Sequence, residues 1–278
     1  MFEERVLVVA TMHGKEKILG PLAEKELGVK VIIPANINTD EFGTFSGEKP
    51  RIKSPIETAR EKAATAMKLT GCDLAIASEG SFGPHPILGI VPANEEWLLF
   101  TDKKNQLEII IRELSTETNY NSQICRNIEE LMAFAKSAGF PEHGLIIRSK
   151  NHGTEPIQKG IQEENILRSV AKLFIEKESE FIVETDMRSM MNPMRRKVIV
   201  SAGEKLMKKL KSTCPSCHFP GFDVEEVLSG LPCSQCSLPS RSPLAYILRC
   251  KKCAYENRKD FPHEKTTEDP MYCDYCNP

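Results

Sequence analysis

Four cysteine pairs of the type C-x-x-C occupy the last quarter of the sequence and limit what this part of the chain can fold into. Two thiolates separated by two residues can bind one zinc ion from a tight turn, and a second pair completes a tetrahedron with bonds of about 2.3 Å. Eight such cysteines therefore predict two structural zinc ions. The predicted ligands are Cys214, Cys217, Cys233, Cys236, Cys250, Cys253, Cys273 and Cys276.

The pairing of these motifs is open at the level of sequence, because sequential, crossed and nested arrangements all give four thiolates per ion. We predict the nested arrangement. The inner "CSQC" and "CKKC" enclose a strand-like "LAYILR" and resemble a zinc ribbon, so the outer "CPSC" and "CDYC" are left for the second ion. His218 and His263 are interpreted as ordinary polar residues rather than substitute ligands. Four thiolates close the coordination shell, which favours structural over catalytic zinc.

Charge and composition exclude several classes of protein. The formal net charge over 278 residues is -2, which argues against wholesale binding to nucleic acid or to membranes. The start of the chain lacks the basic and apolar segments of a secretion signal, and no apolar stretch approaches the roughly 20 residues that cross a bilayer. We therefore expect a cytoplasmic protein with reduced thiols.

The cysteine-rich tail has its own charge balance. Residues 212–278 contain seven Lys and Arg against nine Asp and Glu. Two four-thiolate zinc sites would add negative charge, so protein contact or a packed cap is favoured over nucleic-acid binding, although "RCKKC" leaves the latter open.

The first two thirds of the chain alternate between strand and helix patterns. A β-α-β start is predicted from "RVLVVA", a helix near 15–27 and "VKVIIP". Residues 54–71 are predicted to form a helix with Ser54 as N-cap, Glu57 in a capping box and Gly71 at the C-terminal end. Helices near 122–138 and 161–177 then alternate with "GLIIR", expected as a fourth parallel strand, and "EFIVE". We predict an α/β domain over 1–205, with a mixed sheet flanked by helices, and a zinc-binding domain over 206–278.

Acidic residues near predicted strand ends are the candidate catalytic groups. Asp40 and Glu41 precede a Gly-Thr-Phe turn, Glu79 lies in "SEGSFG", expected as a turn, and Asp186 ends a later strand. Asp40 and Glu41 could hold magnesium together with Glu79, since this ion prefers oxygen ligands and substrate phosphates. A solvated acidic loop is the alternative for Asp40 and Glu41.

Basic residues are the candidate phosphate ligands. Lys15 follows the first strand at a helix start, where phosphate binding is favourable. Residues 188–211 hold eight Lys and Arg and one Glu, a segment charge of +7, and Arg188 and Arg195 stand at or before its helix start. An apolar stripe with the lysines solvated on the other face is the plainer interpretation.

The motifs "VATMHGKE", "TDEFGTF", "ETAREKAATA" and "IASEGSFG", in this order, resemble the inosine triphosphate pyrophosphatase-like superfamily. The resemblance implies a fold of that type and magnesium-dependent hydrolysis of noncognate nucleoside triphosphates. It also implies that Glu41 and Glu79 serve as metal ligands or base, Asp40 as an auxiliary acid, and Lys15 and Lys62 as phosphate binders.

With "ETDMRSMMNP" before "CPSC" and "YCDYCNP" at the end, the chain as a whole resembles an uncharacterised bacterial family with the same two-part build. This second resemblance implies no activity. From the candidate residues and the superfamily resemblance, we expect a magnesium-assisted hydrolase or binder of a nucleotide or another phosphorylated small molecule, with structural zinc. The alternative is a non-enzymatic zinc module that binds nucleic acid or a protein partner.

Overall fold

A computed structural model describes residues 1–34, 53–150 and 157–278. The chain separates into Met1–Met207 and Lys208–Pro278, which we call unit 1 and unit 2. No helix within these described ranges combines the length and the apolar character needed to cross a bilayer.

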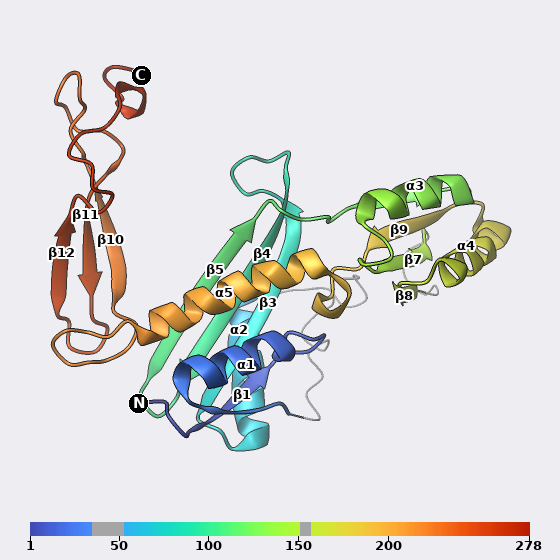
Figure 1. Cartoon of the computed structure of the whole chain (residues 1–278), viewed down its shortest axis with the longest axis horizontal. Helices are drawn as coiled ribbons and strands as arrows, with labels where there is room; N and C mark the ends of the chain where they lie inside the picture. Colours follow the sequence, from blue (N-terminus) through green and yellow to red (C-terminus); the bar gives the residue numbers. More distant parts are fainter. Residues whose placement is uncertain (35–52, 151–156) are drawn as a thin grey trace. The chain divides into compact units, whose positions relative to one another are not determined.

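A mixed five-stranded sheet forms the first part of unit 1, in the order β2-β1-β3-β4-β5 (Figure 1). The β-α-β start is confirmed, because α1 connects two strands that pair in parallel. The third strand is also parallel to the first, whereas the last two form an antiparallel hairpin beside it. The elements are β1 (Val6–Ala10), α1 (Glu16–Leu27), β2 (Lys30–Ile32), α2 (Pro55–Thr70), β3 (Leu74–Pro84), β4 (Pro92–Asp102) and β5 (Leu107–Ser115).

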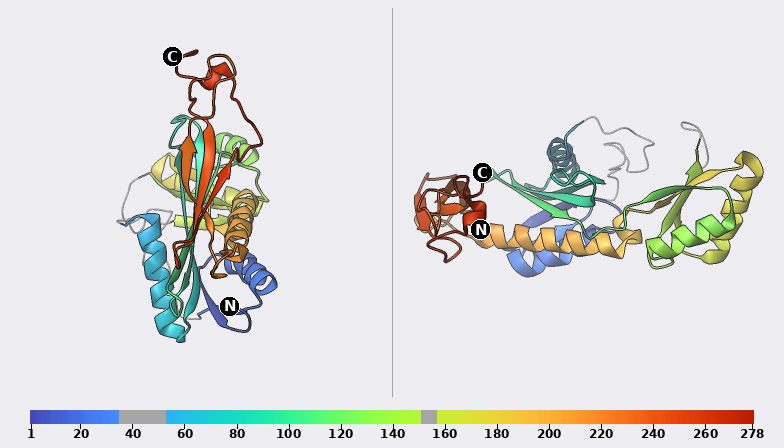
Figure 2. Two further views of the ribbon diagram at one scale, coloured as in Figure 1. Left: turned by 90° about the vertical axis from the view of Figure 1, so that its left-hand side faces the viewer. Right: turned by 90° about the horizontal axis from the view of Figure 1, so that it is seen from above.

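Helices cover both faces of this sheet (Figure 2). Alanines 59, 63 and 66 of α2 pack on Val8, Ala75 and other small apolar side chains of one face. The helix has the predicted Ser54 and Glu57 capping box and ends at Gly71 in the left-handed conformation. On the other face lie α1 and α5 (Pro193–Lys211), which approach each other closely at Gly203.

The predicted turn at "SEGSFG" is wrong. These residues continue β3, which is eleven residues long and pairs with β4 along its whole length. Glycines 80 and 83 had suggested a turn, but a strand tolerates them where the partner strand supplies the contacts, and Gly80 faces a large side chain across the ladder. Glu79 therefore lies within a strand.

A second sheet, not foreseen, forms the rest of unit 1. Its four strands are all antiparallel to their neighbours, in the order β6-β9-β7-β8, so the predicted fourth parallel strand is wrong. The predicted helix over 122–138 begins only at Ile128, because Asn127 caps it and the residues before it pair with β9. The elements are β6 (Ser122–Cys125), α3 (Ile128–Ala138), β7 (Leu145–Ser149), β8 (Ile157–Ile161), α4 (Glu164–Glu178) and β9 (Phe181–Thr185).

Helices α3 and α4 share one apolar core with this sheet. Leu131 and Phe134 of α3 and Leu167 of α4 pack with Ile147 and Phe181 of the strands. The free cysteine Cys125 is buried in the same core, as expected for a small apolar residue.

A short 3-10 turn, η2 (Ser189–Met191), leads into α5 at the predicted Asn192-Pro193 start. The Asn192 side chain caps the helix by accepting a hydrogen bond from the backbone N–H of Arg195 at 2.9 Å. The predicted apolar stripe is confirmed, since Val198, Ile199, Ala202, Leu206 and Leu210 are all buried.

Unit 2 contains a three-stranded antiparallel meander in the order β10-β11-β12. Its strands are β10 (Asp223–Ser229), β11 (Pro243–Arg249), which includes the predicted "LAYILR", and β12 (Glu256–Asp260). A 3-10 turn, η3 (Pro270–Tyr272), precedes the last cysteine pair.

Candidate functional site

The first three C-x-x-C motifs fold into the same kind of tight turn. In each, the N–H of the first cysteine donates to the carbonyl oxygen five residues later at 2.9 Å, as from Cys214 to Phe219. The residue after the second cysteine has a positive φ: 57° at His218, 62° at Ser237 and 56° at Ala254. The turn therefore presents both thiolates of a motif to the same side.

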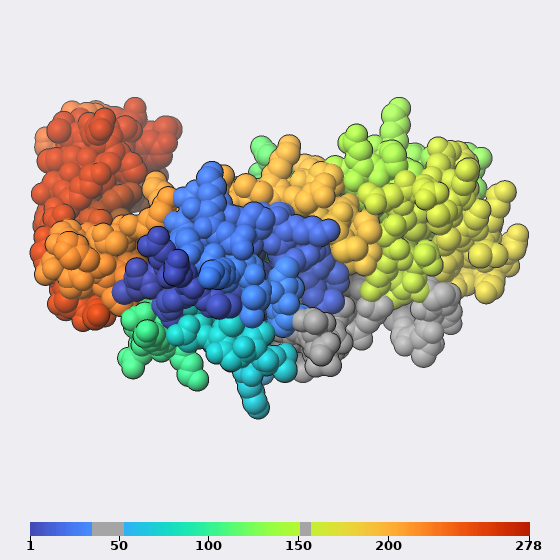
Figure 3. Space-filling model, turned by 60° about the horizontal axis from the view of Figure 1, so that its bottom comes forward, coloured from blue at the N-terminus to red at the C-terminus, as the bar shows by residue number. Residues whose placement is uncertain are grey.

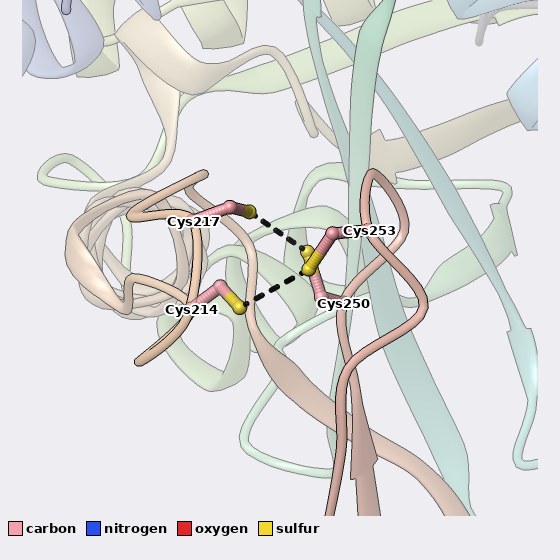
Figure 4. Close-up of side chains that lie close together, drawn as sticks. All are labelled: Cys214, Cys217, Cys250 and Cys253. Carbon is pink, nitrogen blue, oxygen red and sulfur yellow. Dashed lines mark hydrogen bonds between the residues drawn. The ribbon is translucent and has the colours of Figure 1, made fainter.

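Two of these turns form the first cysteine cluster, called site 1, which consists of Cys214, Cys217, Cys250 and Cys253 (Figure 4). The sulfur atoms of Cys214 and Cys253 are 3.7 Å apart, and those of Cys217 and Cys250 are 3.6 Å apart. Sulfurs at the corners of a tetrahedron with 2.3 Å zinc bonds lie about 3.8 Å apart. The spacing therefore fits one zinc ion.

The second cluster, called site 2, consists of Cys233, Cys236, Cys273 and Cys276. Its sulfurs are 3.8 Å apart between Cys233 and Cys276 and 3.7 Å apart between Cys236 and Cys273. Both clusters are thus compatible with zinc, and four sulfurs complete each ligand set without a histidine. His263 instead lies 2.9 Å from the hydroxyl of Tyr246.

The nested pairing predicted from the sequence is wrong, and the crossed pairing is found. The reason is the meander: β10 runs from one end of the sheet to the other and β11 returns. The motif before β10 and the motif after β11 therefore share one end, where they form site 1. The motif between β10 and β11 lies at the opposite end of the sheet. Strand β12 then leads back to that end, where the last motif joins it to form site 2.

Buried charges gather in unit 1, where Lys15, Lys62, Glu79, Glu96 and Arg195 form what we call the charge cluster. Glu96 of β4 binds two cations: its Oε2 lies 3.0 Å from Nζ of Lys15, and its Oε1 accepts from Nε of Arg195 at 2.6 Å. Glu79 forms an ion pair with Lys62 of α2. All five side chains are buried.

Five elements, α1, α2, β3, β4 and α5, bring these residues together. Lys15 stands at the start of α1, just after β1, and Arg195 in the first turn of α5. The Arg195 guanidinium also donates to the backbone carbonyl of Met187 and stacks 5.0 Å from the Phe82 ring. The N–H of Met190 donates to the carbonyl of His13 at 2.8 Å. Figure 3 shows the start of α5 in gold beside the N-terminal segments in blue.

Electrostatics within the charge cluster shift two pKa values. Burial lowers the pKa of Lys15 to about 8; the negative charge of Glu96 opposes this shift, and the nearby Arg195 adds to it. Burial alone would raise the pKa of Glu96, but the charges of Arg195 and Lys15 outweigh it and hold that pKa below its ordinary value. Glu96 is therefore ionised at neutral pH.

The other predicted site residues have different surroundings. Asp186 is buried and forms a bidentate ion pair with Arg188. Nη2 of Arg188 donates to Oδ2 at 2.6 Å, and its Nε donates to Oδ1 at 3.0 Å. Asp186 also accepts from the N–H of Gly160 in β8 at 3.1 Å, so the pair ties the segment after β9 to that strand. Asp40 and Glu41 lie outside the described residues.

Glu96 was missed by the sequence interpretation, although a signal was present. It lies in "EEWLLFTD", where residues 96, 98, 100 and 102 are all buried and alternate along β4. A carboxylate on the buried side of a strand needs a cationic partner. That alternation could have pointed to Glu96.

The comparisons with known proteins identify a family whose match crosses the boundary between the two units. A family model described as a domain of unknown function (DUF6671) matches residues 62–278. The search among curated proteins returned no match. Among solved structures, the crystal structure of protein VC0702 from Vibrio cholerae covers 48% of this chain and 74% of that chain, at 10% identity and a TM-score of 0.28. A TM-score this low supports no conclusion, and the superfamily resemblance stays a prediction from sequence motifs.

Proposed function

The chain belongs to the DUF6671 family, and we propose that it binds a phosphorylated small molecule at the charge cluster of unit 1, while two zinc ions hold unit 2 together. The observation that carries the proposal is the concentration of buried cations at the start of two helices. Lys15, Lys62 and Arg195 lie in one buried cluster, with Lys15 at the start of α1 and Arg195 in the first turn of α5. Cations gathered at helix N-termini favour an anionic ligand.

The position of Lys15 supports phosphate as the anion. The start of α1 has no side-chain cap, and the loop before it has left-handed residues at His13 and Gly14. Backbone N–H groups at a helix start and a lysine beside them are the donors that bind phosphate in proteins. The nucleotide class expected from the superfamily resemblance provides such a group.

The same contacts favour an anion over magnesium. Magnesium prefers carboxylates that can turn their oxygens to the ion. Glu79 and Glu96 already pair with cations, and Asp186 pairs with Arg188. Magnesium binding would have to use Asp40 and Glu41 as well, so we confine the proposal to binding and do not extend it to hydrolysis.

The direct test compares two substitutions on the same helix. Lys62→Gln removes a buried cation of the cluster, whereas Arg60→Gln removes an exposed one that pairs with Glu108. Inorganic phosphate, pyrophosphate and a panel of nucleoside triphosphates serve as probes in titration calorimetry. We expect at least one probe to bind, and binding to weaken at least about tenfold in Lys62→Gln, the size of a lost charged hydrogen bond.

Arg60→Gln should bind as the unchanged protein does. Absence of binding by every probe, or equal affinities in the two variants, would contradict the proposal. Urea unfolding of each variant separates lost binding from lost folding.

The pH dependence gives a second test. Lys15 binds an anion in its charged form, and burial places its pKa at about 8. Affinity for sulfate, whose own charge is constant in this range, should therefore fall as the pH rises from about 7 to about 9. Lys15→Met should bind weakly and lose this dependence. A pH-independent affinity in the unchanged protein would contradict the role of Lys15.

A further inference from the structure

The two cysteine sites lie at opposite ends of the unit 2 sheet and have different surfaces. At the site 2 end, which comprises residues 230–242 and 261–278, four large side chains of the two cysteine turns and of η3 are exposed. Their relative exposures are 41% for Leu238, 56% for Met271, 48% for Tyr272 and 66% for Tyr275. Such a concentration of exposed aromatic and apolar side chains is typical of interaction surfaces.

The site 1 end, residues 212–222 and 250–255, serves as an internal comparison. Here Phe219 and Phe222 are buried, and the ammonium group of Lys252 lies 4.9 Å from the Phe219 ring. Tyr255 is 38% exposed and packs against Phe222 with ring centroids 6.0 Å apart. The turn at Cys214 thus buries its aromatic residue Phe219, so exposure of large side chains at the site 2 end is not a requirement of this type of turn.

Charge distinguishes the two ends as well. The site 2 end contains two cations, Arg241 and Lys265, and four carboxylates, Glu264, Glu268, Asp269 and Asp274. Two minus four gives -2, and four thiolates around a divalent ion add a further -2. The site 1 end has Lys251 and Lys252 and no carboxylate, and its +2 balances its own thiolate site.

We propose that the site 2 end binds a basic segment of a partner protein, in which lysine or arginine side chains lie against Tyr272 and Tyr275. Aromatic faces attract cations, and the attraction grows in a negative surrounding field. The aliphatic stems of the same side chains match Leu238 and Met271. Nucleic acid is disfavoured at this end, because phosphates would meet charge of the same sign.

The local contacts support a surface that is in place before binding. The N–H of Arg241 donates to the carbonyl of Tyr272 at 3.3 Å, and the Asn277 amide donates to the carbonyl of Met271 at 3.1 Å. The cysteines on either side of Tyr275 are ligands of the predicted zinc ion. Side chains carried by a fixed backbone lose less entropy on binding.

The test uses the full zinc-loaded chain and a fluorescent peptide of about ten residues with four spaced lysines and arginines. A peptide with glutamates at the same positions and a single-stranded oligonucleotide are the comparison probes. We expect the basic peptide alone to bind, with an affinity that falls as salt rises. Tyr272→Ser and Tyr275→Ser should each weaken binding of the basic peptide at least fivefold, because each substitution removes one cation–π contact.

The matched control is Tyr255→Ser at the site 1 end, which should leave the affinity for the peptide unchanged. Each variant must retain two zinc ions per chain, which separates lost binding from lost folding. Equal binding by all three tyrosine variants, no binding of the basic peptide, or preference for the oligonucleotide would overturn the proposal. Concentration-dependent dimerisation that Tyr275→Ser abolishes, without peptide binding, would also overturn it and assign the surface to a second copy.

Discussion

Glu96 can hold two cations because its two oxygens face different elements, Lys15 at the start of α1 and Arg195 at the start of α5. The space for this arrangement comes from Gly80, its partner across the β3–β4 ladder. A Cβ at Gly80 would lie 2.7 Å from Oε1 of Glu96 and closer still to the Arg195 guanidinium. The absence of a side chain at Gly80 is therefore a condition for the charge cluster.

Gly80→Ala should lower the free energy of unfolding by about 1–3 kcal/mol, because the buried ion pair must move to admit the methyl group. Gly83→Ala on the same strand is the control, since a Cβ there meets nothing within 4 Å. It should leave stability unchanged or raise it by about 0.5–1 kcal/mol, as alanine replaces glycine in a strand. Urea unfolding measures the free energy of unfolding of both variants. Equal values would show that the contacts around Gly80 do not exclude a Cβ atom there.

Residue types and their local spacing predict the cluster only in part. Lys15, Lys62, Glu79 and Arg195 were candidates because each stands near an element boundary or within a motif. Their partners could not be foreseen, since the pairs of Arg195 with Glu96 and of Lys62 with Glu79 depend on which helix covers which face of the sheet. Asp186 and Arg188 are two residues apart, and their mutual pairing was accessible from sequence but was not considered.

At the scale of elements, the direction of successive strands decides which cysteines meet. Motifs separated by two strands of a meander return to the same end of the sheet, whereas motifs separated by one strand lie at opposite ends. The nested prediction placed the motifs on either side of the strand-like "LAYILR" in one site, but β11 has seven residues and carries the chain across the sheet.

Double substitutions distinguish the pairings in solution. Cys214→Ser combined with Cys250→Ser removes two ligands from site 1 and should leave one intact site, hence one zinc ion per chain. Nested or sequential pairing would place these cysteines in different sites and weaken both. Cys214→Ser combined with Cys233→Ser is the companion variant and should impair both sites. Elemental analysis and the visible absorption of the cobalt-substituted protein measure the outcome.

Regular elements with strong local signals were predicted well. The capped helix α2 and the β-α-β start follow from capping residues and apolar periodicity, which act within a few residues. The second sheet was missed because β6 pairs with β9, some 60 residues later, and short strands do not reveal their partners.

At the scale of the whole molecule, the two units differ in what stabilises them. Unit 1 has apolar cores built from helices and sheets. Unit 2 has nine buried apolar residues, of which four are cysteines: Leu210, Cys214, Phe219, Phe222, Leu231, Cys233, Ala245, Cys250 and Cys273. A core this small cannot offset the entropy of ordering the segment without the metal.

A strong chelator should therefore unfold unit 2 and leave unit 1 folded. Limited proteolysis of the chelated full chain should cut within residues 212–278 and leave a resistant fragment that ends near residue 211. Readdition of zinc should restore resistance of the tail. A tail that stays resistant after complete metal removal would show that its fold does not depend on zinc.

The interleaved order of the cysteine motifs has a consequence for biosynthesis. As the chain leaves the ribosome, the Cys233/Cys236 motif emerges before the Cys250/Cys253 motif, which is the partner of Cys214/Cys217. Two half-complete ligand sets therefore coexist until the residues of β11 and the Cys250/Cys253 motif have been added. The centre with Cys253 closes first, and the one with Cys276 must wait for a further 23 residues. A chain that ends within that interval would carry one complete set of four cysteines and one open pair of thiolates.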